Sequence, residues 1–177
     1  MDTVNARWIQ WWCAPWQGAH PGWIEPLARA CGWPAMGAEQ LLRGRHAAFL
    51  SEVGITPSQP PEPVDGIVQW LSLSAGQQAL ALRLVASTCL GWPLQDEENT
   101  THESWCRAIA KALRPGAWLD SGLSDPRGLL AAWAGEACWS RLRLSWAPDV
   151  LSASVIDLPA NKLHTLWHAV LWRVTNA

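Results

Sequence analysis

His164 and His168 stand four residues apart, a spacing found in helical metal sites. Side chains at this spacing share one face of a helix, so both imidazoles could reach the same cation. Position 165 is threonine, so the pair lacks the glutamate of an HExxH zinc motif, and no third ligand is indicated. We therefore predict that the two histidines lie on a helix surface or against a partner, and that they bind no metal.

The cysteines and the short motifs of the chain predict no catalytic chemistry either. An odd number of widely spaced cysteines, without a CxxC pair, indicates neither a disulfide framework nor a zinc cluster. The sequence contains no GxSxG elbow, no GxxxxGK[ST] phosphate loop and no GxGxxG loop. We expect free thiols in a reducing compartment, no enzyme activity and no cofactor.

Tryptophan carries almost all of the aromatic volume, since the chain has 15 Trp, 1 Phe and no Tyr. Trp11, Trp12 and Trp16 lie in a stretch rich in proline and glycine, which predicts little regular structure to bury them. Tryptophan is enriched among binding hot spots, so these three are candidate partner contacts, with burial against the helices as the open alternative. Other tryptophans fall within helical patterns and are expected mostly in the core: Trp105, Trp133, Trp139, Trp167 and Trp172.

Arg141 and Arg143 are the remaining candidate contact residues. Apolar and polar residues alternate over 139–146, which is typical of a short strand, although the end of a helix also fits. On a strand, the two guanidinium groups would point to one side and could pair with an acidic partner. A solvated edge is the alternative.

The composition predicts one folded domain that carries few charges. Of its 177 residues, 49% are hydrophobic and 16% are charged, with a formal net charge of −2. The chain is too apolar to be disordered. It also lacks the broad positive field that binding to a nucleic-acid backbone requires. Neither a signal peptide nor a membrane span is indicated. We expect a low-charge surface that meets another protein, with no nucleic-acid partner and no membrane insertion.

The elements that position these residues are predicted to be mainly α-helical. Helices are expected over 37–53, 74–90, 100–113, 126–137 and 159–174. Ser74 with Gln77 forms a capping box, and Asp125 before Pro126 is a helix start. In the last helix one apolar stripe is expected to face the core: Leu163, Leu166, Trp167, Val170, Leu171 and Val174.

We predict a single helical domain over 1–177, bundle-like, with at most a short β element near 139–146. It comprises an irregular Trp-rich N-terminal part (1–55), a Pro-rich connector (56–65) and a helical main part (66–177). If the chain forms two lobes, they are expected to meet at the connector.

Three segments resemble the SctK family of bacterial type III secretion proteins, the YscK and HrpD type. They are LSLSAGQQALALRLVASTCLGW at 71–92, GLLAAWAGEACWSRLRLSWAP at 128–148 and LPANKLHTLWHAVLWRV at 158–174. The Trp-rich N-terminal part is similar only loosely.

The resemblance implies a mainly helical, non-enzymatic component of the injectisome sorting platform. Members of the family lie at the cytoplasmic face of the inner membrane, held there through protein partners. They connect the cytoplasmic domain of the membrane-ring protein to the C-ring-like pod protein that leads to the export ATPase. The resemblance implies no catalytic residue, cofactor or metal ligand.

Two other functions stay open on the sequence alone. A type III secretion chaperone or effector-binding accessory would usually be smaller and more acidic, with a strand-rich dimerisation core. A helical enzyme or small-ligand-binding domain would need convergent polar residues in a pocket.

Overall fold

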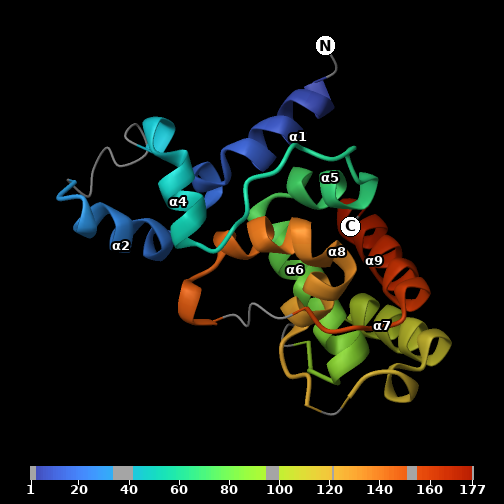
Figure 1. Cartoon of the computed structure of the whole chain (residues 1–177). Coiled ribbons are helices and arrows are strands. Elements are labelled where there is room, and N and C mark those ends of the chain that lie inside the picture. The colour runs from blue at the N-terminus through green and yellow to red at the C-terminus, as the bar shows by residue number, and fades with distance from the viewer. Residues whose placement is uncertain (1–2, 34–41, 95–99, 121, 151–154, 177) are drawn as a thin grey trace. The chain divides into compact units, whose positions relative to one another are not determined.

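The computed structural model describes residues 3–33, 42–94, 100–120, 122–150 and 155–176, and every regular element in these ranges is helical (Figure 1). The prediction of a mainly α fold is thereby confirmed. The α-helices are α1 (Thr3–Cys13), α2 (Pro21–Ala30), α4 (His46–Glu52), α5 (Asp65–Ser72), α6 (Ala75–Val85), α7 (Thr100–Leu113), α8 (Pro126–Leu142) and α9 (Ala160–Thr175). A π-helical turn, Ala86–Leu90, continues α6.

The chain divides into two compact units. Unit 1 consists of Met1–Val64 and Glu136–Ala153, and unit 2 consists of Asp65–Gly135 and Ser154–Ala177. One division falls at the end of the Pro-rich connector and another falls inside α8. The segment 136–153, which was predicted to belong to the helical main part, lies in unit 1.

The N-terminal part is helical, where an irregular region had been predicted. Pro15 and Pro21 occupy the first positions of a 3₁₀ turn (Pro15–Gly18) and of α2. At a first position the missing proline N–H has no intrahelical partner to lose, so these prolines start helical turns and do not break them. Among the prolines that the structure describes in residues 3–33, Pro26 is the one that lies inside a helix.

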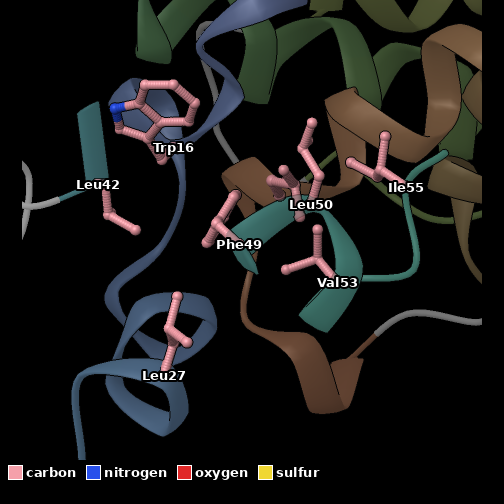
Figure 2. Close-up of a cluster of buried hydrophobic side chains, with 8 residues drawn as sticks. Trp16, Leu27, Leu42, Phe49, Leu50, Val53 and Ile55 are labelled. Atoms are coloured by element: carbon pink, nitrogen blue, oxygen red, sulfur yellow. The ribbon is translucent and has the colours of Figure 1, made fainter. Parts of the chain in front are cut away.

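The core of unit 1 gathers residues from the 3₁₀ turn Pro15–Gly18, α2, α4 and the turn after α8 (Figure 2). Phe49 and Leu42 are fully buried there, and Trp16 meets the Phe49 ring edge to face at 6.3 Å. The buried cluster comprises Trp16, Leu27, Leu42, Phe49, Leu50, Val53, Ile55 and Leu144. The helix expected over 37–53 is interrupted at Arg45, and its first residues, 37–41, lie outside the described residues.

The short β element expected near 139–146 is wrong. Residues up to Leu142 continue α8, and Arg143–Ser145 form a 3₁₀ turn. Cys138, Trp139 and Leu142 are buried together, and their spacing is that of one helix face. The alternation covered too few residues to distinguish a strand from the end of a helix.

Helix α9 is the centre of unit 2 and packs against α5, α6 and α7. All six residues of the predicted apolar stripe are buried, which confirms that prediction. The fully buried Trp167 stacks on Trp133 at 5.3 Å, meets Trp70 edge to face at 5.7 Å and donates its indole N–H to the Leu129 carbonyl. The three indoles therefore form the aromatic part of this core.

Helix boundaries follow the predicted signals. Ser74 and Gln77 form the reciprocal capping box at the start of α6, and the Asp125 carboxylate accepts from the backbone N–H of Arg127. Gly54 and Gly91 follow their helices with φ of 70° and 72°, the left-handed region that glycine enters without steric cost.

Gly135 divides α8 into two helical segments. Its φ of 74° and ψ of 162° lie in a region that is essentially restricted to glycine. This residue is also the last of unit 2 before the chain continues in unit 1. The helix predicted over 126–137 therefore contains this break, and its two parts belong to different units.

Candidate functional site

Arg141 and Trp12, two of the predicted partner contacts, form an internal pair in unit 1. The guanidinium of Arg141 lies over the Trp12 ring, 3.7 Å from its centroid. Its Nε donates to the Trp12 carbonyl and its Nη1 to the Ala137 carbonyl, each at 3.1 Å. Only 4% of Arg141 and 3% of Trp12 is exposed. These residues hold α1 against the second segment of α8 and present no surface to a partner.

Burial shapes the electrostatics of both arginines. It lowers the pKa of Arg141 and of Arg143, because the charged form loses solvation. Arg143, which is half-buried, donates to the Val53 carbonyl and lies over the Trp23 ring at 4.7 Å. Arg143 therefore has partners within unit 1, where an acidic partner from outside had been predicted.

The other two predicted contacts differ from each other in exposure. Trp16 is buried in the core of unit 1, whereas Trp11 is half-buried. Trp11 packs against Trp8 and Trp12, with ring centroids 5.1 and 6.1 Å apart. Of the five predicted contact residues, only Trp11 and Arg143 keep part of their surface accessible.

Trp8 and Trp12 also hold the Pro-rich connector in place through hydrogen bonds from their indole N–H groups. Trp8 donates its Nε1 hydrogen to the Pro61 carbonyl at 2.8 Å, and Trp12 donates to the Ser58 carbonyl at 3.1 Å. A shallow hollow of about 310 Å³ lies beside these contacts, lined by Asn5, Trp8, Ile9 and residues 60–63. Each indole thus pairs its N–H while it buries its ring, as large buried tryptophans generally do.

Unit 2 exposes two tryptophans that were not among the predicted contacts. Trp172 on α9 is 61% exposed, and Trp92, just after the π turn, is 50% exposed. Trp172 is the exposed member of the group of tryptophans that was expected mostly in the core. Position 172 lies outside the apolar stripe of 163, 166, 167, 170, 171 and 174. The helical pattern of the sequence therefore already indicated that Trp172 faces away from the core.

Trp92 borders an open pocket of about 370 Å³ in unit 2. The pocket lies between the end of the π turn and α7, and an ion pair of Glu103 with Arg107 at 3.2 Å contributes to its wall. Further lining residues are Ser87, Gly91, Pro93, Leu94, Cys106 and Ala110.

The Cys89 thiol of unit 2 is a poor nucleophile. Burial, together with the nearby Cys106, raises the pKa of Cys89 to about 12, so the thiol stays protonated near neutral pH. Cys106 is buried and donates weakly to the Leu84 carbonyl. Within the described ranges, no three His, Cys, Asp or Glu residues come together to hold a metal ion.

No helix in the described part of the chain combines the length and apolar character that crossing a membrane requires. No protein-family model matches the chain, and neither a curated protein nor a solved structure was found to match it. Within the described residues, the protein is all-helical and divides into two units. Unit 2 exposes two large aromatic side chains, Trp92 and Trp172.

Proposed function

We propose that this chain is a non-enzymatic adaptor of a bacterial type III secretion injectisome. It would connect the cytoplasmic domain of the membrane-ring protein to the C-ring-like pod protein, at the cytoplasmic face of the inner membrane. The proposal rests on the resemblance of 71–92, 128–148 and 158–174 to the SctK family. A mainly helical chain is what that resemblance implies.

The observation that carries an adaptor role is the exposure of Trp92 and Trp172. Each lies in a segment that carries the resemblance, and each leaves half or more of a large indole accessible. Indole side chains contribute a large apolar contact area and are enriched among residues that dominate binding energy. We therefore assign partner contact to these two residues, in place of Trp12, Trp16 and Arg141.

The test is mass spectrometry of the proteins that co-purify with a tagged copy from the native bacterium under mild salt, with an untagged control. Recovery of the membrane-ring and pod proteins is the expected result. Trp92→Ala and Trp172→Ala should each reduce recovery of one partner about tenfold or more, since hot-spot truncations cost about 2 kcal/mol or more.

A matched control comes from unit 1, where Ile9 is an exposed apolar residue of 41% accessibility. Ile9→Ala should leave recovery unchanged, and circular dichroism should show that all three variants fold. Recovery of neither partner by the wild-type chain would contradict the proposal. Full recovery by both tryptophan variants would contradict the assigned surface.

The pocket beside Trp92 favours a second candidate, a helical small-ligand-binding domain. Its volume of about 370 Å³ is in the range of small-molecule sites, and its lining combines an indole with a carboxylate and a guanidinium. Native mass spectrometry of the purified chain distinguishes the two functions. A bound small molecule lost in Trp92→Ala, without recovery of ring or pod protein, would favour ligand binding.

A further inference from the structure

The outer face of α9 carries two imidazole rings side by side. The ring centroids of His164 and His168 lie 4.1 Å apart, with 47° between the ring planes. Both residues are exposed, on the side of α9 that the buried stripe leaves to solvent. Within the described part of the chain, neither ring is held by a hydrogen bond. Their nitrogens are therefore available to a ligand.

The separation of the rings suits a shared cation. A Zn–N bond is about 2.0 Å, so two imidazoles on one tetrahedral zinc have ring centroids about 5 Å apart. The observed 4.1 Å reaches that value by a small rotation of two solvent-exposed side chains. Since both residues lie on successive turns of one regular helix, the backbone need not move. The sequence had predicted no metal, because the HExxH glutamate and a third ligand are missing, and the exposure and proximity of the rings are the observations that favour one.

We propose that His164 and His168 together chelate a divalent transition cation of the Zn²⁺, Ni²⁺ and Cu²⁺ class. One nitrogen of each neutral imidazole donates to the metal, and water completes the coordination. Imidazole suits these cations better than it suits Mg²⁺ or Ca²⁺, which prefer oxygen ligands. The site is separate from the pocket at Trp92 and does not depend on the proposed adaptor function.

The test is isothermal titration of the untagged full chain with ZnCl₂. Cys13 and Cys31 are exposed free thiols and could bind zinc themselves, so the titrations use the Cys13→Ser, Cys31→Ser background. We expect one zinc per chain. His164→Ala and His168→Ala should each weaken binding at least tenfold, whereas His46→Ala, which removes an exposed histidine of α4, should leave it unchanged.

A spacing variant separates chelation from the mere number of histidines. Thr165 is exposed on α9, so His168→Ala combined with Thr165→His keeps two imidazoles but places them on adjacent positions that point apart. This variant should bind zinc as weakly as His168→Ala alone. Equal binding by the spacing variant and the parent chain would overturn the proposal.

Nuclear magnetic resonance of the imidazole rings provides a readout that is independent of affinity. Zinc should shift the ring nitrogen signals of His164 and His168 and leave those of His20 and His46 in place. Zinc-induced shifts that spare His164 and His168, or that fall equally on all histidines, would also overturn the site.

Discussion

At the scale of single residues, Arg141 was predicted to contact a partner protein, but it is buried and stabilises the interior of unit 1. Its guanidinium is stacked on Trp12 and hydrogen-bonded to two carbonyls. Arg141→Ala should destabilise the protein by about 2–4 kcal/mol, because it opens a cavity over Trp12 and removes the buried hydrogen bond to the Trp12 carbonyl. The free energy of unfolding in urea measures this loss.

Arg107 provides the control for that experiment. It pairs with Glu103 one helical turn away, and its side chain is 73% exposed. Arg107→Ala should change stability by less than about 0.5 kcal/mol, as expected of an exposed ion pair. Equal effects of the two substitutions would contradict the internal role of Arg141.

His102 predicts a pH dependence. Burial, followed by the positive charges of Arg173 and Arg83, lowers its pKa below the ordinary 6.5, and its Nδ1 accepts from Arg173 Nε at 3.2 Å. Because the unfolded chain then binds the proton more readily than the folded chain, stability should fall as the pH drops below 6.5. Urea unfolding at pH 7.5 and 5.5 should show a smaller loss in His102→Gln than in the wild type. His46→Gln, with an exposed histidine of unit 1, should retain the full loss.

At the scale of elements, Gly135 interrupts α8 at a position where the local sequence predicts a continuous helix. Its backbone conformation excludes other residues, so Gly135→Ala should cost about 1–3 kcal/mol or shift the junction of the two helical segments. Gly76, in the first turn of α6, has a φ outside the left-handed range, and no atom lies close to the position that an alanine methyl would take. Gly76→Ala should instead stabilise by about 0.5 kcal/mol, and thermal unfolding of the pair tests the contrast.

Elements with long, regular patterns were predictable from sequence, and short ones were not. The stripe of α9 extends over about three turns, so its periodicity is unambiguous, and the Ser74 capping box depends only on neighbours in sequence. Burial of Trp12 depends on Arg141, which lies 129 positions later in the chain. No local pattern carries that information, so the predicted contact surface in unit 1 could not be distinguished from a core. The strand near 139–146 failed because eight residues fit both periods.

At the scale of the whole molecule, the chain forms two compact units. We therefore expect each unit to have its own free energy of local unfolding. Phe49 is fully buried in unit 1 and Leu166 is fully buried in unit 2. Phe49→Leu and Leu166→Val should each cost about 1 kcal/mol, and the loss should concentrate in the unit that holds the residue. Amide hydrogen exchange followed by mass spectrometry resolves where protection is lost.

The informative peptides come from the two segments of α8. Residues 136–142 belong to unit 1 and residues 126–134 to unit 2, although they are contiguous in sequence. Phe49→Leu should therefore speed exchange in 136–142 and spare both 126–134 and α9, and Leu166→Val should do the reverse. A change in protection that crosses Gly135 undiminished in both variants would mean that the chain opens as one cooperative unit. In that case Gly135 would interrupt the helix without separating two parts of the chain that unfold independently.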